Sequence, residues 1–240
     1  MGFDPLQLLK FLQNFPKFLI SFIRFSSQNQ FQRLKIAAVL TDFKQEGGIA
    51  SGHYFWQDLI CAKWIFEAQP VNHFDIGSRV DGFVSHLLAF REVDILDIRP
   101  IRSNVPGLKV HLGDAQLPLT QFEGQFQSVS SLHAIEHFGL GRYGDKIDYA
   151  GHKKGLINIA ACVQIDGYLY LSFPIGSPST EFNSQRILDP NWPIEVLSNF
   201  ELIDFVLIPW KFDPVFNTWP STVDINLKGQ AGLYKFKRKY

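Results

Sequence analysis

The sequence predicts an α/β fold: a seven-stranded, mostly parallel sheet with helices on both faces, preceded by an N-terminal amphipathic helix. From about Lys35 onward, short apolar runs alternate with longer stretches of helical periodicity, which is the pattern of βαβ units. With 46% hydrophobic and 19% charged residues, the chain is too apolar to be disordered. Its 240 residues fill one domain with a sizeable core. We therefore expect a helical extension over 1–34 and a main domain over 35–240.

The N-terminal helix is expected over residues 5–25, where large apolar side chains surround one polar stripe. The stripe consists of Lys10, Asn14, Lys17, Ser21 and Arg24. Its cations and Pro16 interrupt any apolar run long enough to span a bilayer. No short basic region precedes an apolar block with a small-residue cleavage site, so a signal peptide is not expected. Two interpretations stay open: contact with the inner face of a membrane, or packing on the main domain or on a partner in a homodimer.

The strands are expected where Val, Ile, Leu, Phe and Tyr cluster between turn-forming residues. In chain order they fall at 71–76, 94–98, 108–112, 126–132, 168–173, 200–208 and 231–237. Helical periodicity predicts helices at 55–67, 80–90, 150–163 and 191–199, and Asp189-Pro190 opens the last of them. The alternation of the two kinds of segment is what predicts parallel pairing.

Charge and cysteine content exclude several classes of protein. Lys and Arg total 23, and Asp and Glu total 23, so the chain lacks the basic field with which proteins hold nucleic acid phosphates. Cys61 and Cys162 lie far apart within apolar stretches, which favours buried thiols over a disulfide framework. We expect a cytoplasmic protein that does not bind nucleic acid.

Polar residues and glycines follow the first four predicted strands at their carboxyl ends, where open parallel sheets bind ligands. The first strand ends in the segment Asp75-Ile76-Gly77-Ser78-Arg79, and the second ends at Asp97. This spacing is close to that between a glycine turn and a carboxylate that reaches ribose hydroxyls. Asp114 and Ala115 follow the third strand, and His133, Glu136 and His137 follow the fourth. Together these segments predict one nucleotide-like site.

On these residues the chain, from about 71 to 237, resembles the class I, Rossmann-like S-adenosylmethionine-dependent methyltransferases. The resemblance implies that Gly77 lets the methionine part of the cofactor lie against backbone and that Asp97 holds the ribose diol. Asp114 and Ala115 match the adenine-binding position. Asp75 and Ser78 belong to the first loop, and His133 begins the segment that faces both cofactor and acceptor. Segments 52–58 and 139–145 are most similar to an uncharacterised methyltransferase-like family associated with surface-polysaccharide biosynthesis.

The glycine loop departs from that family. Arg79 and Asp81 stand where the second and third glycines are usual, and Gly82 follows one position late. The guanidinium of Arg79 suits the methionyl carboxylate of the cofactor, because arginine pairs with carboxylates through two hydrogen bonds. The alternative is a cleft that no longer accepts the cofactor, since each lost glycine removes room for close backbone approach.

His133, Glu136 and His137 form a His-x-x-Glu-His motif, which on a helix would suggest a zinc protease. The motif begins at a strand end, so we do not expect one. A divalent metal bound by these three residues, with His152 as a further ligand, stays an unfavoured alternative. Without a metal, His137 is the expected general base. Asp145, in a glycine-rich loop interpreted as a mobile lid, is expected to orient that imidazole or bind sugar hydroxyls.

The expected function is methyl transfer from S-adenosylmethionine to a hydroxyl of a glycan or glycan precursor. The alternative is a catalytically silent scaffold with the same fold, which docks to a membrane or to a glycan-assembly partner. Arg79 and Asp81 favour the scaffold, whereas Asp97 and Asp114 favour the enzyme. A nicotinamide oxidoreductase is not expected, because the full glycine fingerprint is missing.

Overall fold

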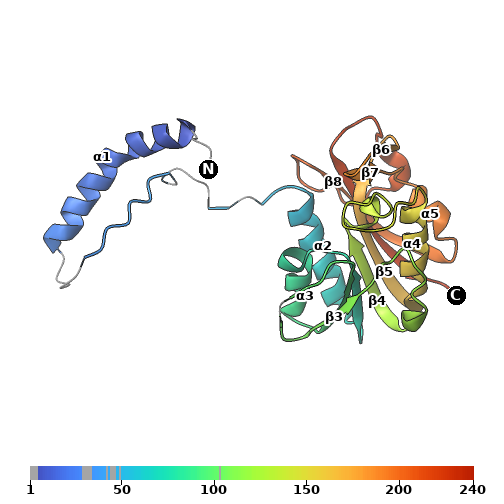
Figure 1. Ribbon diagram of the computed structural model, residues 1–240. Helices are drawn as coiled ribbons and strands as arrows, with labels where there is room; N and C mark the ends of the chain where they lie inside the picture. The colour runs from blue at the N-terminus through green and yellow to red at the C-terminus, as the bar shows by residue number, and fades with distance from the viewer. Residues whose placement is uncertain (1–4, 29–33, 42, 44–46, 49, 103) are drawn as a thin grey trace. The chain divides into compact units, whose positions relative to one another are not determined.

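A seven-stranded sheet forms the centre of the fold, in the order β3-β2-β1-β4-β5-β9-β8 (Figure 1). The computed structural model describes residues 5–28, 34–41, 43, 47–48, 50–102 and 104–240. The strands are β1 (His73–Ile76), β2 (Val93–Asp97), β3 (Leu108–Leu112), β4 (Phe126–Leu132), β5 (Val163–Ile175), β8 (Phe200–Pro209) and β9 (Gln230–Arg238). Strands β1 to β5 pair in parallel, and β9 is antiparallel to both β5 and β8. The predicted mostly parallel sheet is confirmed.

The strand order reverses at β1. From β1 the chain moves outward to β2 and β3 on one side, and then returns to place β4 and β5 on the other. The loops after β1 and β4 therefore leave the sheet in opposite directions, which opens a crevice at their carboxyl ends.

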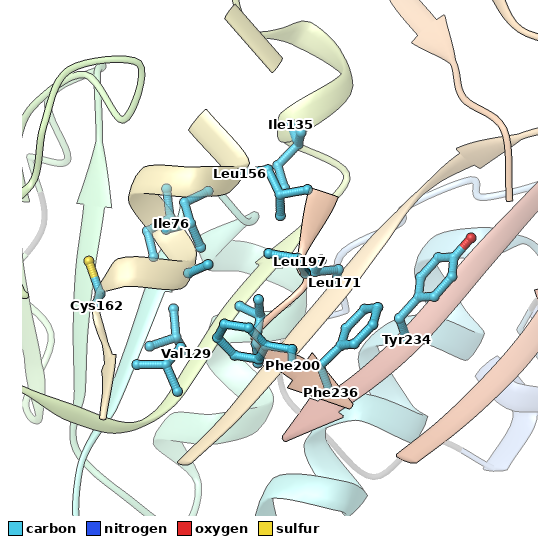
Figure 2. Packing of buried hydrophobic residues seen from close by; sticks show 14 of the residues in the cluster. Ile76, Val129, Ile135, Leu156, Cys162, Leu171, Leu197, Phe200, Tyr234 and Phe236 are labelled. Carbon is cyan, nitrogen blue, oxygen red and sulfur yellow. The ribbon is translucent and has the colours of Figure 1, made fainter. Parts of the chain in front are cut away.

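Helices cover both faces of the sheet (Figure 1). On one face lie α2 (His53–Ala68) and α3 (Ser85–Leu88), and on the other lie α4 (Gly151–Ala161) and α5 (Trp192–Val196). Strand side chains alternate between the two layers: Leu169 and Leu171 pack with α4, whereas Tyr170 packs with α2. Figure 2 shows Leu171 among the buried side chains of the α4 layer. The two apolar layers fix the sheet, and so fix the positions of the strand ends.

Two segments differ from expectation. The helix expected over 80–90 begins as a π-helical turn, η1 (Val80–Val84), and continues as the short α3, because Gly82 takes a non-helical backbone conformation. A hairpin of β6 (Ser179–Glu181) and β7 (Gln185–Ile187) was not expected. The strands of this hairpin have three residues each, too few to show a strand-like alternation in sequence.

The predicted N-terminal helix is present as α1 (Pro5–Gln28). Contacts divide the chain into two units, Met1–Ile49 and Ala50–Tyr240, so the division lies beyond the expected boundary at residue 34. Within the first unit, Nδ2 of Asn14 donates a 2.7 Å hydrogen bond to the carbonyl oxygen of Leu40. Among the helices in the described ranges, none is long and apolar enough to cross a membrane.

Candidate functional site: a cleft at the carboxyl ends of β1 to β4

A cleft of about 510 Å³ lies at the carboxyl ends of β1 to β4. Nine of the predicted site residues line it: Gly77, Ser78, Arg79, Asp97, Asp114, Ala115, His133, His137 and Asp145. Asp75 and Glu136 were also predicted, but they are fully buried and do not line the cleft. The strand ends thus bring the predicted residues together around one cavity.

Gly77 brings the loop after β1 against the segment after β4. Its φ of +74° lies in the left-handed region, which favours glycine, and a Cβ atom there would sit 3.0 Å from Cβ of Ala134. The backbone N–H of Gly77 donates to the carbonyl of Leu96 at the end of β2. This position therefore keeps bare backbone at the cleft surface, where a ligand can approach closely.

Asp75 supports the same loop from below. Its carboxylate accepts hydrogen bonds from the backbone N–H of Ser78 (3.0 Å), from Oγ of Ser78 (2.7 Å) and from Oγ of Ser130 (2.5 Å). Burial raises the pKa of Asp75 to about 7 despite these donors. Oγ of Ser78 also accepts from the N–H of Leu132, which joins the ends of β1 and β4. Asp75 thus holds the glycine loop and, although it was expected among the cofactor-binding residues, it is fully buried and does not line the cleft.

The irregular glycine loop has a structural explanation. Arg79 donates from Nε and Nη2 to the carboxylate of Asp81 (3.1 and 2.9 Å), and both side chains are exposed. Gly82 approaches α2 so closely that a Cβ atom would lie 2.8 Å from Oδ2 of Asp58. Burial raises the pKa of Asp58 to about 6. Gly82 therefore allows the loop to pack closely against α2, and the guanidinium of Arg79 is already bound to the carboxylate of Asp81.

The carboxylate of Asp97 is nearly buried and is held by Arg99. The guanidinium donates from Nε to Oδ1 (2.9 Å) and from Nη2 to Oδ2 (2.8 Å), and the backbone N–H of Arg99 donates to Oδ1 (2.8 Å). Cζ of Arg99 lies 4.4 Å from the centroid of the Tyr143 ring, a cation–π contact across the cleft rim. Sequence reasoning missed Arg99, although it stands only two positions from Asp97.

The loop after β3 presents Asp114 and Ala115 to the cleft. Asp114 accepts the backbone N–H of Gln116 (2.8 Å), and the carbonyl of Ala115 accepts Nδ2 of Asn158 on α4 (2.9 Å). These bonds fix the loop and leave backbone and carboxylate atoms at the cleft wall.

Two imidazoles flank the buried carboxylate of Glu136. Nδ1 of His133 lies 2.9 Å from Oε1 of Glu136, and Nε2 of His137 lies 3.8 Å from the same oxygen. Nδ1 of His137 is 2.6 Å from the carbonyl oxygen of Ser184, so it carries the proton and leaves Nε2 as the acceptor. His133 has a φ of +49°, an uncommon conformation for a non-glycine residue, and its Nε2 is buried without a hydrogen-bond partner among the described residues.

Aromatic rings pack around His133. The rings of His53 and Tyr54 on α2 lie 5.5 and 5.1 Å from its ring, measured between centroids. Burial, followed by the proximity of His133, lowers the pKa of His53 to about 4, which keeps that ring neutral at physiological pH. The histidines at this end of the cleft therefore lie among other rings, beside the buried carboxylate of Glu136.

Asp145 and Arg186 fix the loop that was expected to be a lid. The carboxylate of Asp145 accepts the backbone N–H groups of Gly139, Gly141 and Tyr143. Arg186 on β7 is 4% exposed and donates to backbone carbonyls, among them that of Phe138 at 2.6 Å. Asp145 therefore organises its own loop, although its position in the sequence predicted that it would orient His137 or bind sugar hydroxyls. Arg186 was not singled out from the sequence.

The part of the chain that the structure describes contains no cluster of three His, Cys, Asp or Glu side chains suited to a metal ion. His152, the suggested further ligand, does not line the cleft and instead packs its ring 5.2 Å from that of Trp192. The geometry of the described residues thus does not support a metal site at the His-x-x-Glu-His motif.

Comparisons with known proteins agree with this architecture. The N-methyltransferase NodS from Bradyrhizobium japonicum WM9, crystallised with S-adenosylhomocysteine, superposes with a TM-score of 0.51 at 10% identity, over 79% of this chain and 89% of that chain. A putative methyltransferase from Bacillus halodurans gives 0.53 at 11% identity, over 75% and 99% of the two chains. The chain has a methyltransferase fold. The [4+2]-cyclase SpnF gives 0.53 at 9% identity, over 80% and 88%, so this fold also occurs in a protein named for other chemistry.

A family model described as "Caenorhabditis protein of unknown function, DUF268" matches residues 108–206, from β3 into β8. No curated protein matches the sequence. These three structural neighbours are 9–11% identical to this chain and therefore inform its fold, while its chemistry has to be argued from its own side chains.

Proposed function

We propose that this chain is a methyltransferase that binds S-adenosylmethionine in the cleft. The observation that carries the proposal is the convergence of Gly77, Asp97 and Asp114, from the ends of three neighbouring strands, on one cavity. The cleft fits the cofactor: it offers backbone that a Cβ atom would cover at Gly77, and a carboxylate at Asp97 for a diol. When bound, the cofactor supplies a methyl group activated by a positively charged sulfur.

Each strand end has a proposed role. Gly77 admits the methionine part, Asp97 accepts hydrogen bonds from the ribose hydroxyls, and Asp114 with Ala115 borders the adenine. Arg99 has to move or share the carboxylate, because its two donors already occupy both oxygens of Asp97. The side chain of Arg99 is half-exposed and contacts the ring of Tyr143, so it has solvent into which to move. Arg79 remains the proposed partner for the methionyl carboxylate, through donors now shared with Asp81.

His137 is the proposed general base. Its Nδ1–H donates to the carbonyl of Ser184, so Nε2 is left to accept a proton from an acceptor hydroxyl in the cleft. Oε1 of Glu136 lies 3.8 Å from Nε2, beside the position that the accepted proton would take. Nδ1 of His133 lies 2.9 Å from Oε1 of the same carboxylate.

The proposed acceptor is a hydroxyl of a glycan or glycan precursor. Two features support this choice: a base placed for a weakly acidic hydroxyl, and the likeness of segments 52–58 and 139–145 to the polysaccharide-associated family. Arg142 and Tyr143, beside the cleft, offer a guanidinium and an aromatic face for such an acceptor. Cys61 and Cys162 are buried and unpaired, which supports a reducing, cytoplasmic setting. Homodimer formation remains a further proposal without a described interface.

The silent scaffold is the second candidate function. One specific observation favours it: two arginines at the cleft already form ion pairs with neighbouring carboxylates, Arg99 with Asp97 and Arg79 with Asp81. A cleft closed by its own side chains would not take the cofactor.

Calorimetric titration of the full chain with S-adenosylhomocysteine separates the two candidates. Saturable binding of one molecule per chain supports the methyltransferase, and absence of binding at millimolar concentration rejects it in favour of the scaffold. Formation of S-adenosylhomocysteine from S-adenosylmethionine in the presence of nucleotide sugars and lipid-linked sugars then tests the acceptor class.

A further inference from the structure

Helix α1 leaves its apolar side chains exposed within its own unit. The large apolar residues exposed along the helix are Leu6, Leu8, Leu9, Phe11, Leu12, Phe15, Leu19, Ile20, Ile23 and Phe25. Among the side chains of α1 that the structure describes, only Asn14 is buried, and it donates to the carbonyl of Leu40. The segment over 34–41 thus covers one residue of the polar stripe, Asn14, and leaves its cations exposed, whereas a helix that packs in a core buries its apolar side. The apolar surface of α1 therefore needs a partner outside the unit.

The segment over residues 5–41, which includes α1, carries only positive charge. Residues 5–41 contain five cations and no Asp or Glu, in a chain whose net charge is zero. The cations are Lys10, Lys17, Arg24, Arg33 and Lys35. Lys10, Lys17 and Arg24 form no ion pair with any residue in the described ranges. By contrast, Lys237 and Lys239 of the second unit pair with Asp166 and Glu201. No residue that the structure describes thus neutralises the cations of α1, which leaves them available to an external anion.

We propose that α1 lies in the plane of an anionic lipid bilayer and attaches the protein to it. Leu, Ile and Phe side chains of the helix enter the boundary between headgroups and acyl chains, and the cations contact lipid phosphates. Pro16 and the three cations agree with a helix that lies on the surface and does not cross. A second copy of the chain is the weaker occupant, because its α1 carries the same positive charge and no acid to offset it.

The test uses the full chain and vesicles of phosphatidylcholine alone, or of phosphatidylcholine and phosphatidylglycerol in equal parts. We expect co-sedimentation with the anionic vesicles, little with the neutral ones, and release by high salt. In the triple variant Lys10→Gln, Lys17→Gln, Arg24→Gln, the partition coefficient should fall by about fivefold for each cation removed, or roughly a hundredfold in all. The double variant Leu12→Asn, Ile23→Asn should also lose binding.

A matched control removes three exposed cations from the second unit: Lys63→Gln, Lys211→Gln and Lys228→Gln. This control changes net charge by the same amount and should keep vesicle binding. Failure of the full chain to bind anionic vesicles, or equal loss in the control and in the α1 variant, overturns the proposal. In one such outcome the full chain fails to bind vesicles and forms a concentration-dependent dimer in sedimentation equilibrium. If the double variant Leu12→Asn, Ile23→Asn abolishes that dimer, α1 would be assigned to contact with a second copy of the chain. If the full chain does not bind vesicles and the variant Leu12→Asn, Ile23→Asn has a lower thermal stability than wild type, α1 would be assigned to packing on the second unit.

Discussion

The guanidinium of Arg99 donates a hydrogen bond to each oxygen of the Asp97 carboxylate, at 2.9 Å from Nε to Oδ1 and 2.8 Å from Nη2 to Oδ2. The backbone N–H of Arg99 adds a third hydrogen bond to Oδ1. A carboxylate offers about four acceptor positions, so roughly one remains for a ligand. A ribose diol needs two. Binding at Asp97 is therefore a competition between Arg99 and the ligand.

Replacing Asp97 with Ala should weaken S-adenosylhomocysteine binding by about 1.5–3 kcal/mol, the scale of a hydrogen bond to a charged group. Calorimetric titration measures the change. Asp94→Ala is the matched control, because Asp94 lies on the same strand, pairs with Lys109 and His111, and does not line the cleft. Unchanged affinity in Asp97→Ala, or equal losses in both variants, would remove Asp97 from the ligand site.

Replacing Arg99 with Ala should tighten S-adenosylhomocysteine binding by about fivefold, because the ligand no longer has to displace a partly exposed ion pair worth roughly 1 kcal/mol. The same titration checks it, and the double variant with Asp97→Ala should show no such gain. Weaker binding in Arg99→Ala would mean that Arg99 itself contacts the ligand.

Gly77→Ala should cost more stability than Gly124→Ala. Both glycines have left-handed backbone, which costs a non-glycine residue about 1–2 kcal/mol. At Gly124 a Cβ atom meets nothing within 4 Å, whereas at Gly77 it lies 3.0 Å from Ala134. Overpacking adds about 1–3 kcal/mol at Gly77 only. Urea unfolding compares the two variants, and only Gly77→Ala should weaken ligand binding. Equal costs would show that the Ala134 contact relaxes freely.

The titration of Asp75 should lower the free energy of unfolding as pH rises from about 4 to about 7. Its folded pKa is raised to about 7, against about 3.9 when unfolded, so in this window the folded state binds the extra proton. The stabilisation is complete below the unfolded pKa and is lost through the folded one, at up to about 1.4 kcal/mol per pH unit. In Asp75→Asn this dependence should vanish.

The measurement is the difference in free energy of unfolding between wild type and Asp75→Asn at several pH values. Buried His53 and His73, whose pKa values are lowered to about 4 and about 3 by burial, act in the opposite direction but equally in both proteins. Parallel pH profiles would show that Asp75 titrates outside the window.

His137→Gln should lower turnover by about 10²–10⁴ with any acceptor that wild type methylates, while S-adenosylhomocysteine binding stays unchanged. His86→Gln is the control, because His86 is exposed and does not line the cleft. Activity that survives a chelator agrees with a protein base. Activity that a chelator abolishes and a divalent ion restores would instead favour metal chemistry at the His-x-x-Glu-His motif.

Residues next to strand ends were the predictable part of the site. Gly77, Asp97 and Asp114 lie at or just beyond the ends of β1, β2 and β3, and parallel strands deliver their carboxyl ends to one edge of the sheet. Their presence around the cleft therefore follows from local sequence and strand direction. The seven strands were predictable for the same reason, since each main-sheet segment carries its own apolar run.

The hydrogen-bond partners of the side chains around the cleft were not predictable. Arg186 reaches the carbonyl of Phe138 from a hairpin whose short strands show no alternation. Asp145 accepts backbone N–H groups of its own loop, a choice that depends on the turns at Gly139 and Gly141. The pairing of Arg99 with Asp97 depends on which way a flexible side chain folds back, which residue types alone do not decide.

The placement of β9 between β5 and β8 has a consequence for synthesis on the ribosome. Strand β8 is made before β9, yet β9 is its neighbour in the sheet and joins it to β5. Until Gln230 to Arg238 has emerged, β5 presents an unpaired edge and β8 has no place in the sheet. Such edges are templates for pairing with other chains. A nascent chain stalled before Gln230 is therefore the form most in need of a chaperone.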